Sequence, residues 1–138
     1  MSIIARKIEI DLTDEKSSAS AGSVCLSAMA ERLGLPDYLK KSITLKKRAR
    51  GASDVEMLLS LIYRLAQGDG AILDVDRLGA DNARCELLGL DRVPNHRRLG
   101  EYLGRFDDRA CERLLAAARL QALKVIGCVI EHEMQTRG

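Results

Sequence analysis

The strongest helix signal in the sequence is SDVEMLLSLIYRLAQGDG, Ser53 to Gly70. Ser53 and Glu56 have the spacing of a capping box, in which each side chain hydrogen-bonds to the backbone N–H of the other residue. They stand directly before a run of apolar residues, which two glycines close. This pattern predicts a helix over Asp54–Gln67 at the centre of the core.

The apolar positions of that segment recur with the helical period. The main stripe comprises Val55, Leu58, Leu59, Ile62 and Leu65, and it is widened by Met57, Leu61 and Ala66. A stripe of this width predicts contact with neighbouring elements on more than one side.

Shorter helices are predicted before and after this one. A helix over Ser23–Leu33 has an apolar stripe and is closed by a glycine that can take the left-handed conformation and by a proline. The stripe is Leu26, Met29, Ala30 and Leu33, and the closing residues are Gly34 and Pro36. Three further short helices are expected over Asp37–Lys41, Ile72–Leu78 and Asp81–Leu88, the last two separated by Gly79 and closed by Gly89.

Two capped helices are predicted in the last third of the chain. Asn95 is a good N-cap for a helix ending near Phe106, with Leu99, Leu103 and Phe106 on its buried side. Asp107 or Asp108 then caps a long last helix, with a stripe of Cys111, Leu114, Leu115, Ala118, Ala122 and Val125. Gly127 interrupts that pattern, so that Val125–Ile130 fits a helix or a strand equally well.

The amino end has the one clear strand pattern. Lys7–Leu12 alternates polar and apolar residues, and a polar connector follows it over residues 13–22. The expected fold is therefore mainly α: a compact multi-helix domain with a helix-turn-helix-like pair and a short N-terminal β-strand. Three regions are expected, namely the strand and connector at 1–22, the helical domain at 23–126 and a tail at 127–138.

Composition agrees with a single folded domain. The 138 residues are 46% hydrophobic and 30% charged, with 3% aromatics, which is unlike a disordered chain and favours packed helices. No apolar run is long enough to cross a bilayer and no signal peptide is evident, so we expect a cytoplasmic protein with no membrane contact. The four cysteines form no CxxC pair and are expected to be reduced core residues.

The sequence offers few groups for catalysis, and we expect no catalytic residues, no metal and no cofactor. Asp74 and Asp76 point to different sides of a helix and are interpreted as solvated acids. Cys128 and His132 lie one helical turn apart, but zinc needs three or four ligands. A metal-dependent enzyme built on this pair and its acidic neighbours is the least favoured alternative.

Positive charge is concentrated in KKSITLKKRAR, residues 40–50. In a chain with a formal net charge of +2, this stretch holds six cations and no acid. Such a cluster attracts a polyanion, and the sequence predicts that it binds phosphate groups. The predicted phosphate ligands are Lys40, Lys41, Lys46, Lys47, Arg48 and Arg50. A solvated basic loop without a partner is the alternative.

A second basic cluster lies at the start of the helix that Asn95 caps. Arg92, His96, Arg97 and Arg98 surround that start, and a short helix, a turn and an arginine-bearing helix have the layout of a helix-turn-helix reader. The residues predicted to face a DNA groove are Asn95, Arg97, Arg98 and Arg105. A helical hairpin with an arginine-rich surface is the alternative, because the turn over Gly89–Pro94 is longer than usual.

The order of these features resembles a known family. The successive segments are KIEIDLTDE (7–15), AGSVCLSAMAERLGLPDYL (21–39), RGASDVEMLLSLIYRLAQGDGAILDVDRLGAD (50–81) and CELLGLDRVPNHRRLGEYLGRF (85–106). Together they resemble the amino-terminal region of bacterial insertion-sequence transposases of the DDE group 1 type, over Lys7 to about Leu115. In one departure, Asn95-His96-Arg97-Arg98 stands where the family has small hydroxyl residues.

The resemblance implies a DNA-associated helical domain that precedes an RNase H-like nuclease domain. The family's three metal-binding carboxylates lie downstream of this region, and the chain contains no such motif before Gly138. Residues 127–138 are accordingly a tail or the truncated start of the missing catalytic domain. The expected function is non-catalytic binding of double-stranded DNA at transposon ends, with a second copy or full-length transposase as a possible oligomeric partner. The alternative is a dimerisation module, or a transposase remnant, that does not bind DNA.

Overall fold

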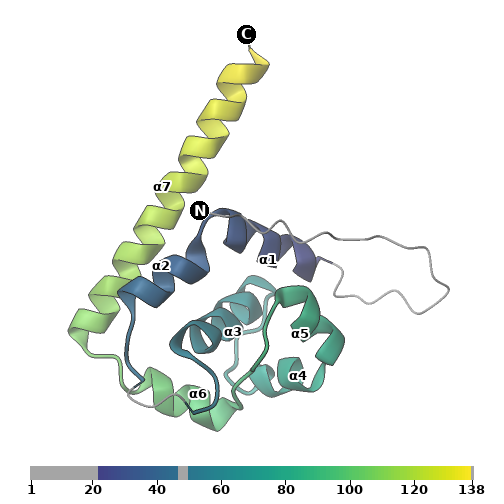
Figure 1. The fold of residues 1–138 in the computed structure, drawn as a ribbon, viewed down its shortest axis with the longest axis vertical. Coiled ribbons are helices and arrows are strands. Elements are labelled where there is room, and N and C mark those ends of the chain that lie inside the picture. The colour runs from purple at the N-terminus through teal and green to yellow at the C-terminus, as the bar shows by residue number, and fades with distance from the viewer. Residues whose placement is uncertain (1–21, 47–49, 138) are drawn as a thin grey trace, which may run out of the picture.

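The computed structural model describes residues 22–46 and 50–137, which form seven helices. Five of them close a ring in which each packs against the next: α1 (Ser23–Arg32), α2 (Leu35–Ser42), α3 (Asp54–Ala66), α4 (Asp74–Ala80) and α5 (Asn82–Leu88). α6 (His96–Leu103) packs on α4, and α7 (Asp108–Thr136) packs on α2 and projects far beyond the ring (Figure 1). The mainly α prediction is confirmed. The predicted strand and connector lie outside the described residues.

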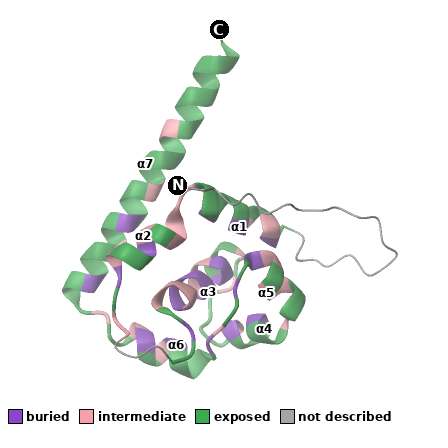
Figure 2. Cartoon of the chain, in the orientation of Figure 1, coloured by how far each residue is buried: buried purple, intermediate pink, exposed green. Residues whose placement is uncertain are grey.

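The capping box that predicted α3 is present. The Glu56 backbone N–H donates to Ser53 Oγ at 3.2 Å, and the Ser53 N–H donates to Glu56 Oε2 at 2.7 Å. α3 supplies a large part of the buried core (Figure 2), including Met57, Leu58, Leu59 and Tyr63. Leu65 is 56% exposed, so its assignment to the buried stripe is wrong. The neighbouring helices cover α3 on the side of Ser60 and Arg64 instead.

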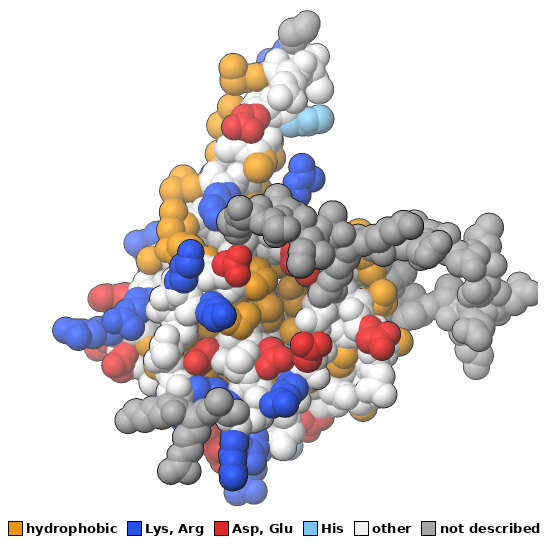
Figure 3. Space-filling view, in the orientation of Figure 1, with side chains coloured by type: hydrophobic (Ala, Val, Ile, Leu, Met, Phe, Trp, Pro, Cys, Tyr) orange, Lys and Arg blue, Asp and Glu red, His pale blue; other side chains and the backbone are white. Residues whose placement is uncertain are grey.

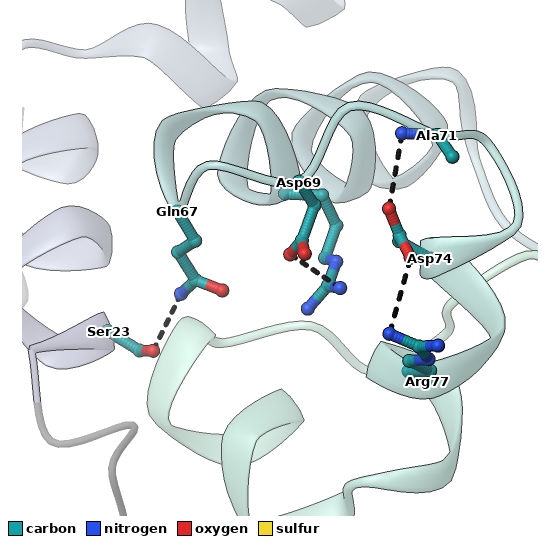
Figure 4. Close-up of polar contacts among 7 residues, drawn as sticks. Ser23, Gln67, Asp69, Ala71, Asp74 and Arg77 are labelled. Atoms are coloured by element: carbon teal, nitrogen blue, oxygen red, sulfur yellow. Dashed lines mark hydrogen bonds and ion pairs between the residues drawn. The ribbon is translucent and has the colours of Figure 1, made fainter.

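Polar contacts close the carboxyl end of α3. Arg64 is 5% exposed, and its Nη2 lies 2.5 Å from Asp69 Oδ2, just past the end of the helix. The Gln67 side-chain amide donates to Ser23 Oγ at 2.7 Å (Figure 4). The last turn of α3 is therefore joined both to the turn that follows it and to the first residue of α1.

Small side chains allow α1 to lie close to α5. Ser23, Ser27 and Ala30 are its buried residues, and Ser27 Oγ donates to the Leu87 carbonyl at 2.8 Å. The predicted stripe is wrong at Met29, which is 53% exposed, because α5 packs against the serine side of α1. Gly34 takes the predicted left-handed conformation with φ of 69°.

The short helices exist, but their bounds differ from the prediction. α2 begins at Leu35 rather than Asp37, because Pro36 stands in its first turn, where the N–H that proline lacks has no helical partner. Gly79 lies within α4 and does not separate it from α5. Asp81 marks that boundary, since its carboxylate accepts from the Arg84 N–H at 3.0 Å and caps α5.

Both caps predicted for the last two helices are confirmed. The Asn95 side chain accepts from the Arg98 N–H at 2.9 Å, and the Asp107 side chain accepts from the Ala110 N–H at 2.8 Å. α6 ends at Leu103, three residues before the predicted Phe106. α7 runs without a break through Gly127, so the strand alternative for residues 125–130 is wrong.

The buried side of α7 differs from the predicted stripe. Ala110 and Ala117 are buried and Leu114 is partly buried, because small side chains let α7 lie close to α2. The other members of the predicted stripe are exposed: Cys111, Leu115, Ala118, Ala122 and Val125. No helix within residues 22–46 and 50–137 has the length and apolar character needed to cross a membrane.

The expectation of core cysteines is also wrong for most of them. Cys25, Cys111 and Cys128 are exposed, the last of them on the projecting part of α7. Cys85 is partly covered, and its thiol donates to the Leu78 carbonyl at 3.1 Å. Burial, with the nearby Asp81 carboxylate, raises the pKa of Cys85.

Candidate nucleic-acid interface

Two basic stretches that are distant in sequence line one surface depression. It has a volume of about 650 Å³ and lies between the loop that joins α2 to α3 and the start of α6. Five cations line it: Lys46, Arg50, Arg92, Arg98 and Arg105. Two acids, Asp91 and Glu101, lie among them. Lys and Arg side chains, with acids among them, are visible at the end of the molecule that α6 forms (Figure 3).

The loop side of the depression is held by Asp54, at the start of α3. Its Oδ1 accepts from the backbone N–H groups of Leu45 and Lys46, at 3.2 and 3.3 Å. Gly51, with φ of 74°, makes the return turn toward Ser53, in a conformation that glycine adopts readily. Asp54 thus folds the loop back onto α3 and brings Lys46 and Arg50 to the same end.

The Lys46 side chain stabilises this loop through hydrogen bonds to the loop's own backbone. Its ammonium group donates to the carbonyl oxygen of Arg50 at 2.6 Å and also to that of Ala52. From the other side, Arg92 Nη1 donates to the Gly51 carbonyl at 3.2 Å. Two cations therefore satisfy backbone carbonyls of the loop, whereas Arg50 is exposed.

The start of α6 forms the opposite side of the depression. Asn95 and Arg98 both line it, and the cap described above joins the Asn95 side chain to the Arg98 backbone. The His96 N–H donates to Asp76 Oδ1 at 2.8 Å, and His96 Nδ1 lies 2.5 Å from Asp76 Oδ2. These contacts attach the first turn of α6 to α4. They also lower the pKa of Asp76, chiefly through the backbone hydrogen bond.

Tyr102 lines the depression from the buried side of α6. It is 2% exposed, and its ring meets that of Phe106 edge to face with centroids 5.6 Å apart. Burial, and then the neighbouring Asp54 carboxylate, raise the pKa of Tyr102. The hydroxyl is thus kept neutral beside the carboxylate that shapes the loop.

The remaining predicted ligands are not gathered there. Arg97 does not line the depression; its side chain is 84% exposed and its Nε lies 3.8 Å from Glu101 on the same helix. Lys40 and Lys41 are exposed on α2, where Lys41 lines a second depression together with Arg113 of α7. Lys47 and Arg48 lie outside the described residues.

Arg92 and Tyr102, which line this depression, and Asp54, which shapes its loop, were not predicted as part of the site. Arg92 belongs to the second basic cluster but was not assigned a DNA contact. Its place two residues before Pro94, in the turn that leads into α6, could have indicated that it lies near the start of that helix. Asp54 was predicted only as the first residue of a helix, although its side chain organises the loop. Tyr102 had no sequence signal beyond its helical spacing from Leu99.

The alternative metal pair lies far from this surface. Cys128 and His132 are exposed along the projecting half of α7, with Glu131 and Glu133 beside them. In the part of the chain that the structure describes, no group of three or more His, Cys, Asp or Glu side chains is placed to hold a metal ion.

The depression has the composition of an anion-binding surface. Five cations against two acids create a local positive field on a nearly neutral chain, and guanidinium groups match phosphate oxygens in geometry. Comparisons of the whole chain with family models, with curated proteins and with solved structures found no match.

Proposed function

We propose that this protein is a non-catalytic helical domain that binds double-stranded DNA, related to the amino-terminal region of insertion-sequence transposases. The observation that supports the proposal best is the convergence of two basic stretches on one depression. Lys46 and Arg50 come from one stretch, and Arg92, Arg98 and Arg105 from another more than forty residues later. Several cations must lie on one surface if they are to contact the phosphates of one DNA backbone together.

In this proposal the parts of the depression have different roles. Arg50 and Arg105 neutralise phosphates, which releases condensed counterions from the duplex. The early residues of α6, Asn95 and Arg98, approach base edges, as those of a recognition helix do, while α6 is held by α4. Lys46 and Arg92 keep the α2–α3 loop in its binding shape through their bonds to its carbonyls. Strand exchange would require a nuclease domain supplied elsewhere.

Fluorescence anisotropy with a labelled duplex tests the proposal. We expect binding to weaken by orders of magnitude between low and moderate salt, with a logarithmic slope that reports the number of phosphates contacted. Arg105→Ala should weaken binding of all sequences about equally and reduce that slope by about one. Arg98→Ala should also change the preference among duplexes.

Arg97→Ala is the matched control, because it removes the same charge from the neighbouring residue outside the depression. Arg97→Ala should lower the duplex affinity less than Arg98→Ala does. Absence of binding at low salt would refute the DNA proposal. Equal losses in the Arg97 and Arg98 variants would refute the placement of the interface at the depression.

A second candidate function is a protein-interaction module that does not bind DNA. It is favoured by a specific observation, namely the row of apolar side chains exposed along α7. The anisotropy experiment separates the two functions, because an interaction module would show no salt-dependent affinity for a duplex.

A further inference from the structure

α7 is longer than its contact with the rest of the protein requires. Its 29 residues span about 43 Å at 1.5 Å per residue. The side toward the ring contains Ala110, Leu114, Ala117 and Gln121, which recur with the helical period and are buried or partly buried. From Ala122 onward every residue up to Arg137 is exposed except Gly127, which is partly buried (Figures 1 and 2).

The exposed part of α7 is rich in large apolar side chains. Eight of them are between 40% and 71% exposed: Leu115, Leu120, Leu123, Val125, Ile126, Val129, Ile130 and Met134. Apolar atoms are visible along the projecting helix in Figure 3. If each large side chain contributes half of its ~60 to 120 Å² of apolar surface, the row exposes about 250 to 500 Å². Monomeric proteins rarely expose more than a few hundred Å² in one patch.

Most of these side chains share one side of the helix. At 100° per residue, Leu115, Leu123, Ile126, Val129 and Ile130 fall within about 60° of the direction of Ile126. That direction is roughly opposite to Ala117, which faces α2. The apolar side therefore points away from the ring of helices and is exposed with respect to the described part of the chain.

Two opposite charges bracket this apolar side symmetrically. Arg119 lies seven residues before Ile126 and Glu133 lies seven residues after it. Seven residues are close to two helical turns, so both charges project on the same side as Ile126. Arg119 is exposed, and the Glu133 side chain is 60% exposed although it lies 3.5 Å from Arg137 of its own helix.

We propose that α7 pairs with α7 of a second copy of this chain in an antiparallel arrangement centred on Ile126. A two-fold axis at Ile126 places Arg119 of each copy opposite Glu133 of the other, and apolar side chains meet between the two ion pairs. A parallel pair in register would instead place Arg119 against Arg119 and Glu133 against Glu133, and like charges in contact are destabilising. The charge pattern thus selects both the partner and its direction.

The amount of surface is consistent with such a pair. The five side chains on this side expose about 150 to 300 Å² of apolar surface on each helix. The pair is therefore smaller than a standard interface of ~800 Å² per partner and belongs to the class of small, reversible interfaces. The two rings would lie at opposite ends of the helix pair, which leaves both cationic depressions free. The pairing does not depend on DNA binding.

Sedimentation velocity across a micromolar concentration series tests the pairing with the full chain. The wild-type protein should be a dimer, and Ile126→Asp should be a monomer, because each copy would bury a carboxylate at the axis. Leu73→Asp is the matched control: it places an aspartate at the N-cap residue of α4, which is 62% exposed and distant from α7 in sequence, and it should leave the dimer intact. Circular dichroism should show the same helix content in all three proteins.

Charge reversal tests the direction. Arg119→Glu and Glu133→Arg should each raise the dimer dissociation constant about tenfold or more, since each creates two like-charge contacts. The double variant restores both pairs in an antiparallel dimer and should recover wild-type association. Arg137→Ala removes the pair within one helix, and in this register Arg137 lies opposite Leu115 rather than a charge, so the variant should have a smaller effect than either reversal.

Each contrary outcome would overturn the proposal. A wild-type chain that stays monomeric throughout the series would exclude self-pairing. Single reversals without effect, or a double variant that is no better than either single one, would exclude the antiparallel register.

Discussion

The Lys124 ammonium nitrogen lies 3.0 Å from the carbonyl oxygen of Leu33, 91 residues earlier in the chain. Leu33 is the C-cap of α1, where carbonyl groups lack helical partners and carry partial negative charge. One side chain of α7 therefore caps α1 while α7 itself packs on α2. This contact stabilises the base from which the rest of α7 projects.

Replacing Lys124 should loosen α7 without unfolding the ring. In Lys124→Met the apolar stem remains and the charged hydrogen bond is lost, at a local cost of about 0.5 to 1.5 kcal/mol. Hydrogen exchange should accelerate in residues 110–124 and at the end of α1, and not in α3. Lys40→Met, the same replacement at an exposed position of α2, is the control. Equal exchange in the two variants would show that the Leu33 contact carries no stability.

Replacing Arg64 should have a larger effect on the whole fold. The guanidinium is 5% exposed and pairs with Asp69, so Arg64→Ala removes a buried contact and leaves a carboxylate without its partner. Because the Asp69 side chain is 28% exposed, we expect a loss of about 2 to 4 kcal/mol, below the upper range for fully buried pairs. Urea unfolding of the wild type and the variant measures this loss in unfolding free energy. A loss no greater than that of Arg77→Ala, which removes a 3.6 Å pair on the surface, would contradict a structural role for Arg64.

Lys46 and Arg50 should differ in how they affect DNA binding, if the depression binds DNA. Lys46→Met removes the donor to two loop carbonyls, so it should lower duplex affinity and also speed hydrogen exchange between residues 43 and 54. Arg50→Ala removes an exposed charge, so it should lower affinity and leave exchange unchanged. Identical exchange in the two variants would show that Lys46 does not brace the loop.

Because of the contact between Asp76 and His96, the free energy of unfolding should depend on pH in the acid range. Hydrogen bonds from the His96 backbone and then from its side chain lower the pKa of Asp76 below its ordinary value of 3.8. A carboxylate with a lowered folded-state pKa stabilises the fold above the unfolded pKa and loses that contribution as pH falls through the folded value. The difference in unfolding free energy between wild type and Asp76→Asn should therefore shrink below pH 3.8. An NMR titration that gives Asp76 a pKa of 3.8 or higher would contradict this.

The features predictable from the sequence are those decided within one helical turn. Ser53 with Glu56, Asn95 and Asp107 cap helices through hydrogen bonds to residues three positions away. Gly34 and Gly89 end helices through their own left-handed backbone conformation. Such contacts need no information about the rest of the chain, and the helix starts that they predicted at α3, α6 and α7 are confirmed.

The predicted buried side is confirmed for α6, where Leu99 is buried and Leu103 is partly buried, but for α1, α7 and the end of α3 the buried side depended on the tertiary structure. Met29 and Leu65 are exposed while Ser27 and Arg64 are buried, because docking depends on which neighbour fits and on whether buried polar groups find partners. α7 is apolar on several sides, so its sequence contains no single stripe to choose. The small residues Ala110 and Ala117 allow close contact with α2, and their side of α7 is the one that is buried.

In the candidate interface, too, some features are visible in the sequence and others depend on folding. The concentration of positive charge in two stretches is visible in the amino-acid sequence, since composition is a local property. Folding brings Lys46 and Arg50 to the same depression as Arg98 and Arg105, and it leaves Arg97 outside. Folding also directs the Lys46 ammonium group to carbonyl groups of its own loop. The physical reason is that a side chain's direction and its partners depend on chain segments far away in sequence, which meet only when the ring of helices closes.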